Sequence, residues 1–268
     1  MAWAWRGNRL SRDRAFDILL SGNSGEALQS AHKICGSHKA DINALPLAQR
    51  RKKLLIADMD STIISCECLD ELADMAGLKP HIAAITERAM RGEIEFESAL
   101  RERVALLKGL PLAALEWTYA ERVHLNLGAK ALVATMKAHG ARTFLVSGGF
   151  TYFTERVAAV AGFDEQQANF LLDDGAALTG EVREPILGRE AKRAALETEV
   201  ARLGIDFADT LAVGDGANDL DMIQRAGLGV AYHAKPVVAE TAGARIAYSD
   251  LRSLLYLQGY SDDEIVEP

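Results

Sequence analysis

From Lys53 onward, short apolar runs alternate with stretches of helical pattern, and this alternation limits the possible folds more than any other feature of the sequence. The runs typical of buried strands are LLIADM (54–59), TFLVSG (143–148), TLAVGD (210–215) and LGVAY (228–232). The helical stretches end at or near glycine and cover 128–140, 149–162 and 187–204. Strands that alternate with helices predict an α/β fold, a doubly wound parallel sheet with helices on both faces.

Three segments do not fit this alternation. Residues 67–125 are helical in pattern, with Pro80 and Pro111 at two expected helix starts, and are far longer than the roughly dozen residues that a parallel crossover needs. Residues 169–185 predict a β-hairpin that turns at Asp174-Gly175. Residues 1–50 form an extension of uncertain structure, with one short helix expected at 24–35. We therefore expect an α/β catalytic core (51–66 and 126–268) with a helical cap inserted at 67–125.

The bulk properties exclude several classes of protein. The net charge is −8, which argues against a partner such as nucleic acid. The sequence has no run of 18 apolar residues for a membrane span, and its first ten residues lack a secretory pattern. The three cysteines suit reduced structural thiols rather than a disulfide framework or a zinc site. A cytoplasmic protein without a membrane partner is expected.

Polar residues stand where three of the predicted strands end. Asp58 and Asp60 follow the first strand, Ser147 the second and Asp215 the third. Ligands of open α/β sheets bind beyond the carboxyl ends of the strands, so these side chains should meet at one edge. Acidic oxygens are ligands that suit Mg²⁺.

Other motifs fail. The glycines of GDGAND are followed by Asp219 where a dinucleotide fingerprint needs a third glycine. Ser147 has Leu145 in place of the glycine of a nucleophile elbow, and no phosphate-loop motif is present. The acidic strand ends therefore favour a different chemistry. A carboxylate held against Mg²⁺ and a lysine can act as a covalent nucleophile, and phosphoryl transfer needs mainly positioning and neutralised charge.

Four ordered segments resemble the motifs of the haloacid dehalogenase superfamily of phosphatases: DMDST (58–62), SGG (147–149), Lys192 and GDGANDLDM (214–222). Within that superfamily, Glu67, the stretch 84–109 and the spacing from Phe96 to Arg103 are similar to the branch that hydrolyses O-phospho-L-serine in serine biosynthesis. The resemblance covers roughly 51–232 and continues more faintly towards the C-terminus. It implies a Rossmann-like haloacid dehalogenase core, a helical cap and a small β-hairpin flap.

The resemblance implies roles for the acidic residues. Asp58 would be the nucleophile that becomes a phospho-aspartate, and Asp60 would protonate the leaving serine oxygen and later deprotonate water. The Mg²⁺ ligands would be the carboxylates of Asp58 and Asp215 with the backbone carbonyl of Asp60. Asp219 would orient the waters of the metal, or simply cap the helix that follows it.

It also implies a phosphate site. Ser147 and the N–H of Gly148 would bind phosphate oxygens, and Lys192 would neutralise charge on Asp58 and on the phosphoryl group. Asn218 would hydrogen-bond the phosphate or the nucleophile.

Substrate choice would depend on the cap. Glu67 would bind the ammonium group and Arg103 the carboxylate of phosphoserine, while Met90 and Phe96 would close an apolar lid. The structural alternatives are a Glu67 that merely stands in the first turn of a helix, and an Arg103 paired at the surface with Glu97 or Glu102.

Two further functions compete with phosphoserine hydrolysis. One is a phosphotransferase that passes the phosphoryl group from phosphoserine to an acceptor such as homoserine. The other is a silent binding module, which would lack the nucleophile, a metal ligand or the lysine, and all of these are present. The expected partner is a small-molecule substrate, for a monomer or a homodimer.

Overall fold

The computed structural model describes the chain except residues 1–4, 22–23, 37 and 91–92. At its centre lies a six-stranded sheet in which every neighbouring pair is parallel. In spatial order its strands are β10 (Ala244–Ile246), β9 (Leu228–Tyr232), β8 (Thr210–Gly214), β3 (Leu54–Ala57), β4 (Arg142–Phe150) and β5 (Glu165–Asn169). The predicted α/β fold with a parallel sheet is confirmed.

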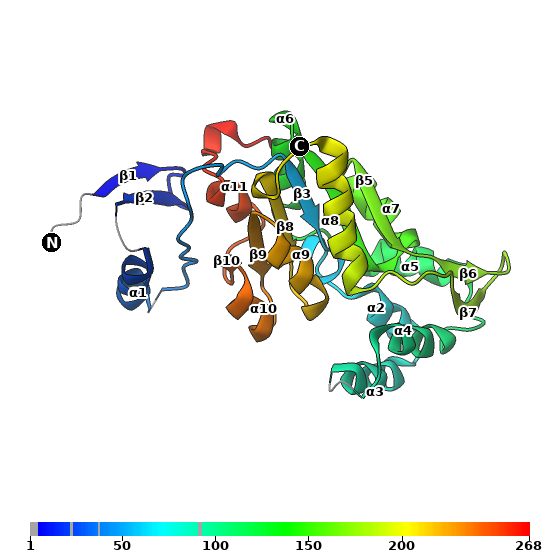
Figure 1. The fold of residues 1–268 in the computed structure, drawn as a ribbon. Coiled ribbons are helices and arrows are strands. Elements are labelled where there is room, and N and C mark those ends of the chain that lie inside the picture. Colours follow the sequence, from blue (N-terminus) through cyan, green and yellow to red (C-terminus); the bar gives the residue numbers. More distant parts are fainter. Residues whose placement is uncertain (1–4, 22–23, 37, 91–92) are drawn as a thin grey trace.

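Helices cover both faces of this sheet (Figure 1). On one face lie α6 (Ala129–Ala138), α7 (Thr151–Ala161) and α11 (Ser253–Leu257). On the other lie α8 (Arg189–Leu203), α9 (Leu220–Arg225) and α10 (Pro236–Thr241). Leu55 packs into the first layer and Leu54 and Ile56 into the second. Successive strand residues face opposite layers, and both are apolar, so the β3 sequence is continuously hydrophobic.

Two strands of the sheet were not predicted, and both lie at its edges. The sequence of β5 is EQQAN, and β10 has three residues. An edge strand is shielded on fewer sides than a central one, so its sequence carries a weaker apolar signal. In the centre, β4 continues to Phe150, two residues beyond the predicted strand.

In its described part, the insertion at 67–125 forms four helices: α2 (Cys68–Met75), α3 (Lys79–Met90), α4 (Phe96–Ala105) and α5 (Leu112–Arg122). Pro80 is the second residue of α3 and Pro111 directly precedes α5, as predicted. The predicted hairpin is formed by β6 (Leu171–Asp173) and β7 (Leu178–Val182). Its Leu178 exchanges backbone hydrogen bonds with residues 109 and 110, of 2.8 and 2.9 Å. The hairpin is therefore joined to the inserted helices.

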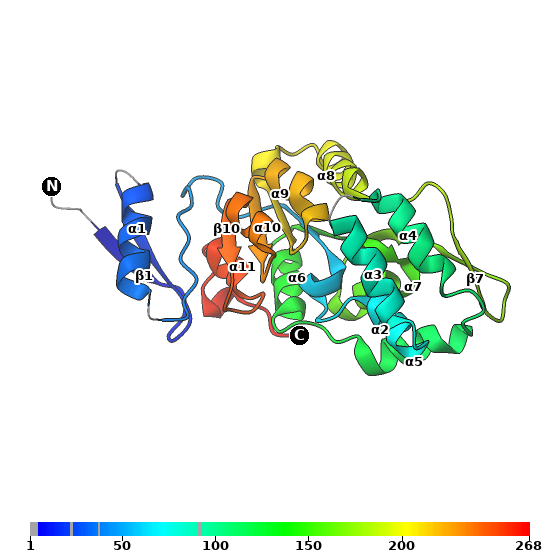
Figure 2. The same cartoon turned by 90° about the horizontal axis from the view of Figure 1, so that it is seen from below.

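The N-terminal extension is more ordered than its sequence indicates. Besides the expected helix α1 (Ser24–Cys35), it contains an antiparallel hairpin of β1 (Trp5–Arg9) and β2 (Phe16–Leu20). Arg50 donates two hydrogen bonds to Asp17, of 2.5 and 2.8 Å, and others to the carbonyls of Tyr256 and Leu257. The extension and the inserted helices lie at opposite ends of the sheet in both views (Figures 1 and 2).

Among the described residues, no helix has the length and apolar character needed to cross a membrane.

Candidate active site

The chain leaves β3 through a tight, irregular turn at 59–63. Asp60 has extended dihedral angles (φ −65°, ψ 137°), and Ser61 has φ 55°, which is uncommon for a residue other than glycine. In an unbroken strand the side chains of Asp58 and Asp60 would point to one side. The turn instead gives the two carboxylates different neighbours.

Asp58 and Asp219 are joined by Lys192 of α8. The ammonium nitrogen lies 2.6 Å from Oδ1 of Asp58 and 2.6 Å from Oδ1 of Asp219, and all three side chains are almost fully buried. Burial by itself lowers the pKa of Lys192, but the two carboxylates outweigh it and hold that pKa above its ordinary value. Removing either charge would leave a buried charge unpaired, so this bridge is a part of the core as well as of the site.

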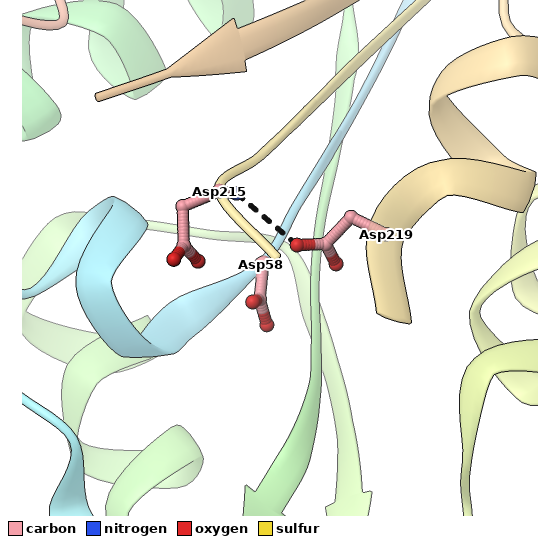
Figure 3. A group of neighbouring side chains, drawn as sticks. All are labelled: Asp58, Asp215 and Asp219. Carbon is pink, nitrogen blue, oxygen red and sulfur yellow. Dashed lines mark hydrogen bonds between the residues drawn. The ribbon is translucent and has the colours of Figure 1, made fainter. Parts of the chain in front are cut away.

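Three carboxylates gather beyond β3 and β8. Oxygens of Asp58, Asp215 and Asp219 lie within 4.8 Å of one another, and Figure 3 shows the three side chains side by side. Burial, and then the charge of Asp219, raises the pKa of Asp215 to about 6. Burial also raises the pKa of Asp58, again with Asp219 as the next cause. Mutual repulsion of this kind is relieved by a cation, so the residues present fit a divalent metal ion with oxygen ligands.

Within this group Asp219 has its oxygens in use. Oδ1 contacts Lys192, and Oδ2 accepts the backbone N–H groups of Asp215 (3.1 Å, dashed in Figure 3) and Gly216 (3.0 Å). Asp219 thereby ties the loop after β8 to α8. Both oxygens of Asp219 therefore contact protein groups, and the carboxylate holds the turn before α9.

The Asp60 carboxylate belongs to a different set of contacts. Oδ1 accepts the backbone N–H of Cys68 at 2.9 Å, and Oδ2 accepts the hydroxyl of Ser147 at 3.1 Å. Burial raises the pKa of Asp60, in spite of these hydrogen bonds, which lower it. A carboxyl group with a raised pKa can carry a proton, which is what a general acid requires.

The segment after Val146 leaves little room for side chains at its glycines. The N–H of Gly149 donates to Oγ of Ser147 at 2.8 Å, and a Cβ on Gly149 would lie 2.8 Å from Oδ2 of Asp60. A Cβ on Gly148 would lie 3.3 Å from the ring of Phe96. Phe96 is the first residue of α4, so the start of this helix lies directly against the loop. Asn218 lies on the neighbouring loop, with its amide oxygen against Gly216.

The predicted ligands of a substrate ammonium and carboxylate also lie in one region. Glu67 precedes α2, but its carboxylate does not cap that helix; it accepts the hydroxyl of Ser61 at 2.6 Å. Desolvation by the surrounding atoms, followed by the charge of Asp60, raises the pKa of Glu67 to about 7. Burial lowers the pKa of Arg103, and Asp70 and Glu67 are the carboxylates that act on it.

In the described part of the chain, the structure does not contain the alternative surface ion pair of Arg103 with Glu97 or Glu102. Glu97 pairs with Arg101 at 3.3 Å, and Glu102 pairs with Arg88 at 3.1 Å. Arg103 donates to the carbonyl of Ala99 at 3.3 Å. The Met90 side chain, predicted to form part of the lid, lies outside the described residues.

Two residues near the site received no role from the sequence. Ser61 is part of DMDST, so the sequence places it next to Asp60, but no signal in the sequence indicates its contact with Glu67. Asn169 ends the polar strand β5, where no motif marks it.

A parallel α/β sheet with an acidic, lysine-bearing site at the carboxyl ends of its strands defines a hydrolase of the haloacid dehalogenase type. The model of the haloacid dehalogenase-like hydrolase family matches residues 55–224, and the chain belongs to that family. A protein of Polaromonas sp. named phosphoserine phosphatase is 49% identical over 210 residues, which are 76% of this chain and 89% of that protein.

Solved structures agree with this assignment. A phosphoserine phosphatase described as a phospho-aspartyl intermediate analogue has a TM-score of 0.71 and 39% identity, covering 77% of this chain and 98% of that one. A haloacid dehalogenase family hydrolase from Salmonella enterica serovar Typhi has a TM-score of 0.86 and 32% identity, covering 95% of this chain and 89% of its own. The match to the Salmonella protein covers 95% of the chain, which is more than the chain without its first 50 residues. The likeness to that structure therefore extends into the N-terminal extension.

Proposed function

We propose that this hydrolase is a Mg²⁺-dependent phosphoserine phosphatase, which converts O-phospho-L-serine to L-serine and phosphate in the last step of serine biosynthesis. The observation that carries the proposal is the separation of the two carboxylates of DMDST: Asp58 is held by Lys192, and Asp60 by Ser147 and the Cys68 amide. Relatives named phosphoserine phosphatase, such as the one that is 49% identical, support the choice of substrate.

In the first half of the reaction Asp58 is the nucleophile. Lys192 and the N–H of Met59 contact its Oδ1, so we assign the attack on phosphorus to Oδ2. A bond forms between Oδ2 and phosphorus as the bond from phosphorus to the serine oxygen breaks. Asp60 gives its proton to that oxygen, and serine leaves as a neutral alcohol.

In the second half Asp60, now ionised, takes a proton from water. The water oxygen bonds to phosphorus, and the bond between phosphorus and Asp58 breaks to release phosphate. Lys192 stays charged throughout and balances the negative charge at Asp58 and the phosphoryl group. The hydroxyl of Ser147 and the N–H of Gly148 would hold phosphoryl oxygens, with the amide of Asn218 beside them.

The residues that would hold the metal are Asp58 and Asp215 through their carboxylates and Asp60 through its carbonyl, with Asp219 orienting bound water. The contacts of Asp60 leave its carboxylate engaged elsewhere, which suits ligation by the carbonyl. Bound Mg²⁺ would supply positive charge next to the phosphoryl oxygens and the nucleophile.

Substrate selection is proposed for the cap formed by residues 67–125, above a core of 51–66 and 126–268. The ammonium group of phosphoserine would bind Glu67, and its carboxylate would bind the guanidinium of Arg103. Phe96, which already covers Gly148, would exclude water together with Met90. The cytoplasmic location and the monomeric or dimeric state stay predictions.

Phosphate release from phosphoserine, phosphothreonine and sugar phosphates, each with MgCl₂ or with EDTA, tests the proposal. We expect release from phosphoserine with MgCl₂ and almost none with EDTA. Equal rates for sugar phosphates would contradict the substrate assignment. Added homoserine tests the phosphotransferase, because transfer would form phosphohomoserine and lower the yield of free phosphate, whereas a hydrolase gives an unchanged yield.

A further inference from the structure

A bulge in β4 places the phosphate-binding segment outside the regular ladder of the sheet. Along β4 the residues paired with β5 jump from Val146 to Phe150, while along β5 they advance only from Gln167 to Asn169. Ser147, Gly148 and Gly149 therefore protrude at the end of the strand. Bulges next to active sites turn groups towards a ligand, but they leave backbone groups without a ladder partner.

The side chain of Asn169 supplies such a partner. Asn169 is the last residue of β5 and only 2% exposed, and its amide Nδ2 donates to the carbonyl of Gly148 at 2.9 Å. The adjoining peptide N–H, that of Gly149, donates to Oγ of Ser147, which in turn donates to Asp60. The hydrogen bonds thus run without a break from Asn169 to the carboxylate of Asp60.

The same side chain holds a second loop. Nδ2 also donates to the carbonyl of Leu187 at 3.1 Å, and Oδ1 accepts the N–H of Leu187 at 2.7 Å. Leu187 lies two residues before the start of α8, the helix that carries Lys192. Both N–H groups of the amide are used, one on each loop, and its oxygen is used as well.

The two loops share one neighbour in the cap. A Cβ on Gly148 would lie 3.3 Å from the Phe96 ring, and a Cβ on Gly188 would lie 3.2 Å from it. The spacing between these loops therefore sets the surface on which the start of α4 packs. An error in that spacing would move the phosphate-binding groups relative to Lys192.

We propose that Asn169 is a positioning residue of this active site, which fixes the phosphate-binding loop at 147–149 relative to the loop that leads into α8. It acts through Ser147, Gly148 and Lys192, and not by contact with the substrate. Its effect concerns the phosphoryl group, which all phosphate esters share, so it should not depend on the rest of the substrate. Only the measurements with phosphoserine rest on the proposed function, and those with other phosphate esters do not.

Two substitutions test this role. Asn169→Asp keeps the shape and the acceptor for Leu187 but removes both N–H donors, while Asn169→Ser shortens the side chain. Thr154→Val is the matched control: it removes another hydrogen bond to β5, from Thr154 of α7 to Gln166 at 2.6 Å, whose two partners belong to neither loop. All variants are compared with wild type by thermal unfolding and by kcat and KM for phosphoserine and p-nitrophenyl phosphate.

We expect kcat/KM to fall at least about tenfold for both substrates in both Asn169 variants, because small displacements of positioned groups are costly in rate. The Thr154→Val variant should lose stability but stay within about twofold of the wild-type kinetics. Wild-type rates in the Asn169 variants, or a loss confined to phosphoserine, would overturn the proposal. If the wild-type protein hydrolyses p-nitrophenyl phosphate but not phosphoserine, the proposed substrate is wrong. The Asn169 variants are then still compared with wild type on p-nitrophenyl phosphate.

A measurement on the wild-type protein applies even if neither Asn169 variant folds. Amide hydrogen exchange is followed with and without orthophosphate in the presence of MgCl₂. If the two loops are coupled, orthophosphate should slow exchange at Leu187 as well as at Gly148. A bound ligand suppresses the local opening of every segment that is held to its site. Unchanged exchange at Leu187, with slowed exchange at Gly148, would contradict the coupling.

Discussion

At the scale of single residues, two aspartates separated by Met59 acquire different properties from their contacts. Asp58 meets the ammonium group of Lys192 at 2.6 Å, which lowers the Asp58 pKa, but burial and the charge of Asp219 outweigh this contact and leave that pKa raised. Asp60 meets a hydroxyl and an amide, and burial raises its pKa. The proposed mechanism assigns the attack on phosphorus to Asp58 and the proton transfer to Asp60 on the basis of these different contacts.

Asp58→Asn tests the covalent mechanism. An amide is a poor nucleophile, so turnover of phosphoserine should fall at least about a thousandfold, while circular dichroism shows an intact fold. Asp221→Asn is the control, because it removes a carboxylate of the segment 214–222 that pairs with Arg189 at the surface. Comparable activity of Asp58→Asn and wild type would rule out a phospho-aspartate at this position.

Arg103→Ala tests substrate selection. Loss of a charged, bidentate partner should lower kcat/KM for phosphoserine by about 100-fold, and kcat/KM for p-nitrophenyl phosphate by no more than a few-fold. Arg101→Ala, two residues earlier on α4, removes a guanidinium whose ion pairs with Glu97 and Glu184 are exposed, and should change neither. Equal losses for both substrates in Arg103→Ala would make this residue structural.

At the scale of elements, the hairpin of β6 and β7 contacts the helices inserted between β3 and α6. Its backbone bonds to residues 109 and 110 join the hairpin to the inserted helices. Gly180 of β7 lies where this contact is tightest: a Cβ would be 2.9 Å from Cβ of Lys108. The position of α4, with Phe96 and Arg103, therefore depends on the hairpin.

Substitutions at two glycines of the hairpin distinguish the effect of this tight contact on stability from the effect of backbone strain. Gly180 and Gly175 have φ of 81° and 89°, and Gly175 has nothing within 4 Å of an added Cβ. Gly175→Ala should cost about 1 kcal/mol for its backbone conformation, and Gly180→Ala at least about 1 kcal/mol more from overpacking, measured by chemical denaturation. We also expect KM for phosphoserine to rise in Gly180→Ala alone. Equal stabilities would show that the hairpin and α4 can separate freely.

At the scale of the whole molecule, stability, pH and metal binding should be linked through the acidic cluster. The pKa of Asp215 in the folded chain is about 6, against 3.8 in an ordinary environment. The folded state therefore holds more protons than the unfolded state between these values, and the metal-free protein should lose stability as pH rises from about 4 to about 6. Asp58, whose pKa is also raised, acts in the same direction.

Mg²⁺ should reverse this trend, because it binds the ionised carboxylates. The rise in Tm from EDTA to MgCl₂ is expected to be larger at pH 7.5 than at pH 5. Asp215→Asn should abolish most of that rise, and Asp221→Asn should preserve it. An equal rise at both pH values would contradict the proposal that these carboxylates hold the metal.

Much of the central architecture could be predicted from the sequence, because buried parallel strands are apolar on both faces and stand out as runs such as LLIADM. The inserted helices and the hairpin followed from the length and turn signals of their segments. The edge strands β5 and β10 and the N-terminal hairpin did not, because half-exposed strands carry mixed sequences.

The sequence by itself determined the family, the residue types of the site and their order, because motifs at strand ends meet wherever a parallel sheet forms. The tertiary structure decided the partners of each group. It set Lys192 between Asp58 and Asp219, turned Glu67 to Ser61, and placed Asn169 across two loops. Such contacts join residues far apart in the chain, or turn on one unusual backbone angle, and neither periodicity nor spacing encodes them.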